Sequence, residues 1–77
     1  MHMTRDFWND VDRFLDTASD AQLAEAKAAV FALLAAPLDH ALRPDIKAVY
    51  RLILDEVRLR AALARRRTAR TPLAVPA

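Results

Sequence analysis

Apolar residues recur every three or four positions along three stretches of the chain, the spacing that puts them on one face of an α-helix. The first stretch, residues 5–17, follows Thr4, a residue type that caps helices. Asp6 near its start suits the positive end of the helix dipole. An amphipathic first helix is therefore predicted, with apolar positions at Phe7, Trp8, Val11, Phe14, Leu15 and Ala18.

The second stretch, residues 20–36, begins and ends at clear signals. Ser19 is followed three positions later by Gln22, which matches a capping box, and Pro37 disfavours helical geometry at the residue before it. From Ala28 to Ala36 the chain has no polar residue on any side. A helix that is apolar all round must be covered all round, and a 77-residue monomer has few elements to do this. The pattern therefore predicts a homodimer.

The third stretch, residues 44–67, opens with Pro44, which is favourable in a first helical turn, and then runs without proline or glycine. One broad apolar face carries Ile46, Val49, Tyr50, Ile53, Val57, Ala61 and Ala64. A second stripe consists of Leu52, Leu59 and Leu63. Two apolar stripes on one helix indicate two neighbours. The leucine stripe is interpreted either as the far side of the core or a homodimer seam, or as a docking site for a partner.

The connection between the second and third helices is short, which favours an antiparallel arrangement of the two. We therefore expect an all-α fold in which these two helices form an antiparallel hairpin, with the first helix packed across it, in a homodimeric bundle. Residues 1–68 are predicted to form a single helical domain. Residues 69–77 contain two prolines and no periodicity, and they are expected to be a flexible tail.

Composition adds two constraints. Apolar residues make up 55% of the chain and cysteine is absent, so disulfides cannot supply stability and oligomerisation is the remaining means. No uninterrupted apolar run reaches the roughly 18 residues needed for a membrane span, and no secretory signal is recognisable. A cytoplasmic protein is expected.

Charge is divided unevenly along the chain. Residues 1–20 hold five aspartates against two arginines, a balance of −3, whereas residues 58–77 hold six arginines and no acid, a balance of +6. An acidic first helix with aromatic residues could meet a basic surface on a partner, with Phe7 or Trp8 as the apolar anchor. The predicted partner-binding residues are Asp6, Phe7, Trp8, Asp10, Asp12 and Asp16.

The basic end of the third helix has several interpretations. Its arginines are Arg58, Arg60, Arg65, Arg66, Arg67 and Arg70. They could contact phosphate, and Arg58, Arg65, Arg66 and Arg67 are the candidate nucleic-acid contacts. Three other interpretations remain. The positive charges could stabilise the negative end of the helix dipole, they could solubilise the terminus, or they could pair with the aspartates of the first helix.

Residues able to carry out catalysis or bind metal are scarce. Ser19 is explained as a helix cap, and Asp39 with His40 offers two ligand types without the further convergent ligands that a metal site needs. We predict no catalytic residue, no cofactor site and no metal site, and hence a non-enzymatic protein.

Two segments carry a family resemblance: Arg13 to Asp20 (RFLDTASD) and Val49 to Glu56 (VYRLILDE). Together with the predicted hairpin and the length, they resemble small helical phage-encoded quorum-sensing anti-activators of Pseudomonas phages. The resemblance covers residues 4–67 in general pattern, without a diagnostic motif, and carries over no functional residue. It implies a dimeric inhibitor that binds a host protein, such as a LuxR-type transcription activator, in the host cytoplasm.

Three functional hypotheses result. The first is a homodimeric interaction module that blocks a host protein. The second is a small DNA-binding regulator that uses the arginine-rich end of the third helix. The third is a structural subunit of a larger assembly that docks through the leucine stripe.

Overall fold

The computed structural model describes residues 4–70, which form three α-helices and, within that range, no strand. The helices are α1 (Arg5–Thr17), α2 (Asp20–Ala35) and α3 (Arg43–Arg70). The predicted all-α class is confirmed. The second helix ends one residue earlier than predicted, while the third begins one residue earlier.

The predicted end of the third helix is wrong. Helix α3 continues to Arg70 instead of ending at Arg67, so residues 69 and 70, which the sequence pattern places in the tail, are helical. Arginine and alanine are good helix formers, and the next proline comes only at Pro72, so nothing local stops the helix at Arg67. The rest of the predicted tail, residues 71–77, lies outside the described residues.

The amino-terminal ends of α1 and α2 are capped as predicted. The Phe7 amide donates to the Thr4 hydroxyl oxygen at 3.2 Å. At α2 the capping box is complete, because the Gln22 amide donates to Ser19 Oγ at 3.1 Å and the Ser19 amide donates to Gln22 Oε1 at 2.9 Å. Each cap satisfies helix-end amides that have no partner within the helix.

A short turn leads from α2 to α3. The Asp39 carbonyl accepts from the amides of Leu42 and Arg43, and the Asp39 side chain accepts from the Ala41 amide at 3.0 Å. Arg43 also reaches back, its Nη1 donating to the Leu34 carbonyl at 3.1 Å. This bond uses a carbonyl in the last turn of α2 and joins the end of one helix to the start of the next.

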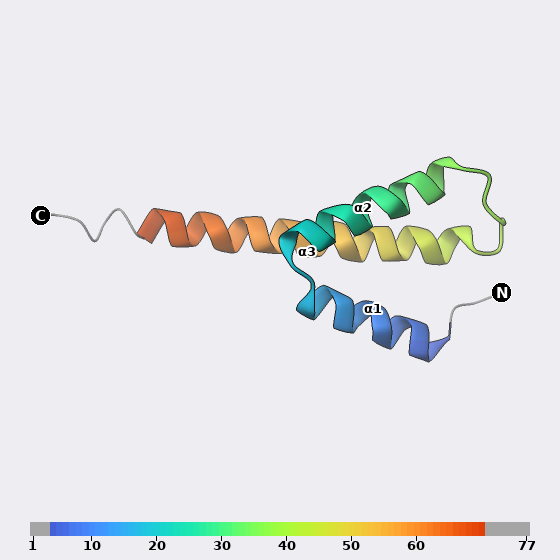
Figure 1. The fold of residues 1–77 in the computed structure, drawn as a ribbon, viewed down its shortest axis with the longest axis horizontal. Helices are drawn as coiled ribbons and strands as arrows, with labels where there is room; N and C mark the ends of the chain where they lie inside the picture. The colour runs from blue at the N-terminus through green and yellow to red at the C-terminus, as the bar shows by residue number, and fades with distance from the viewer. Residues whose placement is uncertain (1–3, 71–77) are drawn as a thin grey trace, which may run out of the picture.

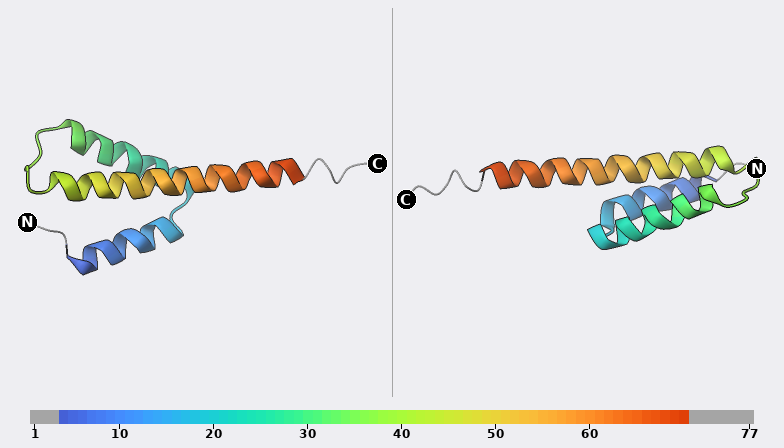
Figure 2. Two further views of the ribbon diagram at one scale, coloured as in Figure 1. Left: turned by 180° about the vertical axis from the view of Figure 1, so that it is seen from behind. Right: turned by 90° about the horizontal axis from the view of Figure 1, so that it is seen from above.

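Figures 1 and 2 show how the helices are arranged. Helices α2 and α3 lie side by side and run in opposite directions, and α1 lies along the same half of α3. The orange and red end of α3 extends well past both shorter helices (Figure 1). One half of α3 is therefore part of a three-helix body, and the other half is not.

The core lies where the three helices meet. Its buried members are Leu15 and Ala18 at the end of α1, Leu23 on α2, and Val49 and Ile53 on α3. Half-buried apolar residues, including Phe7, Trp8 and Leu52, pack around this cluster. No helix within residues 4–70 combines the length and the apolar character that crossing a bilayer requires.

The predicted core face of α3 is covered only in part. Ala61 and Ala64 continue the face that carries Ile53, yet both are exposed. They line an open groove with Leu23 and Ala24 near the start of α2, and the groove leaves them accessible to water. Placing them in the core was therefore wrong, because the first turns of α2 lie beside these alanines without covering them.

Candidate interaction site

The two aromatic residues of α1 that are the predicted anchors belong partly to the core. Phe7 and Trp8 are half-buried and pack against the buried cluster. Their ring centroids are 5.1 Å apart with planes at 80°, an edge-to-face contact that favours both rings. A partner could reach only the outer parts of these side chains.

The four predicted aspartates of α1 are all exposed, but they do not share one face. At about 100° per residue, Asp12 and Asp16 lie roughly 60° and 100° from buried Leu15 around the helix axis, whereas Asp10 lies roughly 140° away in the other direction and Asp6 lies opposite Leu15. Asp10 is 3.8 Å from Arg13, and both side chains are largely exposed, so this ion pair contributes little. The acidic residues therefore spread widely over the exposed side of α1, and only Asp12 and Asp10 border its packed face.

An apolar groove opens between α1 and α2, with α3 as its floor. Its volume is about 290 Å³. Phe7, Val11 and Phe14 form the α1 wall, and Ala26 and Val30 form the α2 wall. Asp10 lies at its edge and is the one charged residue among those lining it. The groove places an apolar surface beside Asp10 of α1.

The predicted leucine stripe is divided by the fold. Leu52 is half-buried and packs against the core cluster, whereas Leu59 and Leu63 are 53% and 42% exposed. The two exposed leucines lie about one turn apart on α3, after Ile53, which is the last buried residue of that helix up to position 68. Leu52 thus contributes to the core, while Leu59 and Leu63 form an open apolar pair.

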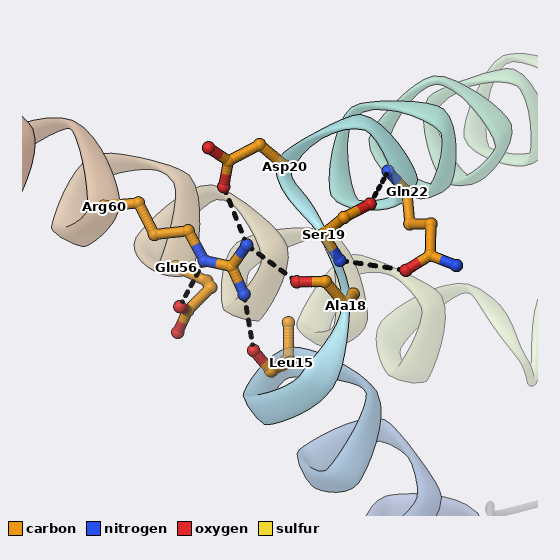
Figure 3. A network of polar contacts seen from close by, with 7 residues as sticks. All are labelled: Leu15, Ala18, Ser19, Asp20, Gln22, Glu56 and Arg60. Carbon is orange, nitrogen blue, oxygen red and sulfur yellow. Dashed lines mark hydrogen bonds and ion pairs between the residues drawn. The ribbon is translucent and has the colours of Figure 1, made fainter.

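A polar network that the sequence interpretation missed is centred on Arg60 (Figure 3). Its Nε donates to Glu56 Oε2 at 2.8 Å, and its Nη1 donates to Asp20 Oδ1 at 2.8 Å. Nη1 and Nη2 also donate to the carbonyls of Ala18 and Leu15 at 2.9 and 3.0 Å. One guanidinium from α3 therefore joins the end of α1 to the start of α2.

The Arg60 network has an electrostatic consequence. Hydrogen bonds to Glu56 and then to Asp20 raise the pKa of the Arg60 guanidinium above its ordinary value. The side chain is 24% exposed, and two carboxylates neutralise its charge. Arg60 is thus a structural residue and does not belong to the candidate phosphate-binding set.

The remaining candidate nucleic-acid contacts are all exposed on α3. Around the helix axis Arg58 and Arg65 share one side, while Arg66 and Arg67 point to other sides. The Arg70 side chain lies outside the part of the structure that is described. The fold therefore gathers these arginines on one end of one helix without placing them on one face.

The residues considered for catalysis have structural roles. Ser19 caps α2, and Asp39 stabilises the turn before α3. Among the described residues no group of three or more histidine, cysteine, aspartate and glutamate side chains is close enough to hold a metal ion.

Comparison with known protein families, curated proteins and solved structures finds no match to this chain.

Proposed function

We propose that the chain is a non-enzymatic interaction module that forms a homodimer of antiparallel helical hairpins and inhibits a host protein. The observation that carries this proposal is the small share of apolar side chains that a single copy covers. Phe31, Leu33, Leu59 and Leu63 are 60%, 47%, 53% and 42% exposed. Exposed apolar surface of this kind favours association with another protein surface.

The exposed apolar side chains lie on separate parts of the surface, so more than one protein could bind to them. Phe31 and Leu33 lie on different sides of α2, and Leu59 and Leu63 lie on α3 beyond the core. A second copy could cover one of these surfaces while a host protein covers another. Light scattering of the purified chain across a hundredfold dilution tests the dimer, and a single monomeric mass throughout would refute it.

The host-binding surface is proposed to be α1. The aspartates Asp12 and Asp16 supply negative charge on one side of the helix, and the groove lined by Phe7 and Phe14, with Asp10 at its edge, supplies apolar contact on the other. Such a surface is complementary to a basic partner with apolar side chains, for example a DNA-binding domain. The resemblance to quorum-sensing anti-activators names a LuxR-type activator as the candidate partner, in the host cytoplasm.

A gel-shift assay with a purified LuxR-type activator and its operator DNA tests whether α1 binds such a partner. The chain is expected to prevent the activator from shifting the DNA in a gel. The double variant Asp12→Lys/Asp16→Lys should inhibit less, and the loss should shrink at high salt. The matched control Glu25→Lys/Asp55→Lys makes the same change in charge at exposed positions on α2 and α3. Equal inhibition by both variants would refute a role for α1.

DNA binding by the end of α3 is the second candidate, and the exposure of Arg58, Arg65 and Arg66 favours it. It predicts binding to duplex DNA that weakens steeply with salt, because each neutralised phosphate releases counterions. Arg65→Glu/Arg66→Glu should abolish a gel shift seen at low salt. Absence of a shift by the unmodified chain would refute this candidate.

A further inference from the structure

A second apolar depression runs along the line where α2 meets α3, and it shares no residue with the groove beside α1. One end has a volume of about 310 Å³ and is lined mainly by Leu23, Ala24, Lys27, Val57, Ala61 and Ala64. The other end, of about 440 Å³, is lined by Ala24, Lys27, Ala28, Phe31 and Tyr50. Ala24 and Lys27 line both ends, so the two form one continuous feature, the seam groove.

The shape of the seam groove suits a helix. The exposed alanines of α2 and α3 have no bulk beyond Cβ and would let another backbone approach closely. Phe31 stands at one end, 60% exposed, with its ring centroid 6.0 Å from that of Tyr50. An incoming helix would contact small side chains along the groove and the Phe31 ring at one end.

The charge of the seam groove is set by Lys27. Its side chain is half-buried, and no group in residues 4–68 pairs with its ammonium. The other charged lining residues are Asp20 and Arg60, and these already pair with each other at 2.8 Å. The Lys27 side chain lies against apolar surface. A partner that carries a carboxylate among apolar side chains would therefore form a charge-assisted bond to the ammonium while covering that surface.

We propose that the seam groove binds an amphipathic helix of a partner protein, which places a carboxylate against Lys27 and small or branched apolar side chains against the alanines. This surface is separate from α1 and opposite to it in charge. A partner bound here would be acidic at its contact, whereas the partner proposed for α1 is basic.

Two display libraries of amphipathic helical peptides test this proposal on the full chain. The libraries are identical except that one carries glutamate, and the other lysine, at the centre of the apolar face. The glutamate library is expected to yield binders whose affinity falls about tenfold or more in Lys27→Glu, since a charge-assisted bond is lost and a repulsion is added. Lys27→Met, which keeps an apolar stem, should show a smaller loss.

The matched control is Lys47→Glu, which makes the same change at an exposed lysine on α3 outside the seam groove. Ala24→Trp gives an independent probe, because it fills the groove without altering charge and should also weaken binding. Circular dichroism confirms that each variant keeps its helices. The α1 variant Asp12→Lys/Asp16→Lys should bind these peptides normally, which separates this inference from the function proposed for α1.

Several results would overturn the inference. These are no binders from the glutamate library, equally good binders from the lysine library, or affinity that survives Lys27→Glu. A second copy of the chain in the groove would also overturn it. In that case Phe31→Glu would dissociate a dimer seen by light scattering, and the peptides would fail to bind the unmodified chain.

Discussion

The clearest test of this fold compares one chemical change at two leucines that differ in burial. Leu23 is 2% exposed at the centre of the core, and Leu59 is 53% exposed on α3. Leucine to alanine removes three side-chain carbons, worth roughly 2.4 kcal/mol when fully buried at about 0.8 kcal/mol per carbon. The cavity left at a packed site raises this to about 3–5 kcal/mol.

Leu23→Ala is therefore expected to lower the free energy of unfolding by about 3 kcal/mol or more, which corresponds to a fall in Tm of roughly 12 °C or more for a domain of this size. Leu59 loses less than half of its contact with water in one copy, so Leu59→Ala should cost about 1 kcal/mol and leave no cavity. The loss expected for Leu23→Ala is a large fraction of the free energy of unfolding of a small domain.

Thermal unfolding followed by circular dichroism at two protein concentrations measures both effects. The loss in Leu23→Ala should be the same at each concentration, because all its contacts lie within one chain. If Leu59 lies in a dimer seam, the cost of Leu59→Ala should change with concentration, since association and folding are then linked. Equal losses for the two variants at high dilution would refute the core described here.

Three further predictions follow from single contacts. Arg60→Met should lower Tm and speed amide exchange in α1, because the bonds to the Leu15 and Ala18 carbonyls are lost; exchange confined to α3 would contradict this role. Since the pKa of Arg60 is raised, its contribution is present below the unfolded-state pKa and is lost only as pH rises through the folded-state value, so the Tm difference from wild type should be constant between about pH 6 and 9. A pH-dependent difference in that range would refute an arginine-centred network. Ser19→Ala should lower stability by about 1 kcal/mol in urea unfolding, whereas Ser19→Gly should cost only a few tenths, and equal losses would argue against the cap.

The sequence was sufficient for the helices because their signals are local. The capping residues Thr4 and Ser19 and the proline at position 37 act within a few positions, and the structure confirms both helix starts and places the end of α2 one residue earlier than predicted. The carboxyl end of α3 was missed because loss of apolar periodicity was taken as loss of helix. A helix needs only suitable backbone propensity, and arginine and alanine supply it.

The features that depend on distant residues could not be predicted in the same way. Periodicity assigned Ala61 and Ala64 to the core, but only the fold shows that they line an open groove beside the start of α2 and remain exposed. For Arg60 the sequence offered one local indication, because Glu56 precedes it by four positions and such a spacing favours an ion pair on a helix. Its bonds to Leu15 and Ala18 join carbonyls more than 40 positions away, and no pattern of side chains indicates a carbonyl as a partner.

The Arg60 network also links stability to the proposed binding surfaces. Helix α1 joins α2 through Ala18 and Ser19 alone, and Arg60 binds Ala18 in that junction as well as Leu15 before it and Asp20 after it. The orientation of α1, and with it the groove lined by Phe7 and Phe14, therefore depends on a residue that a partner at α1 need not touch. Asp20 and Arg60 also line one end of the seam groove, so the ion pair belongs to one surface while Arg60 holds the end of the helix that carries the other. A partner that disturbs this pair from the seam groove would loosen α1, and the two surfaces would then bind their partners with negative coupling.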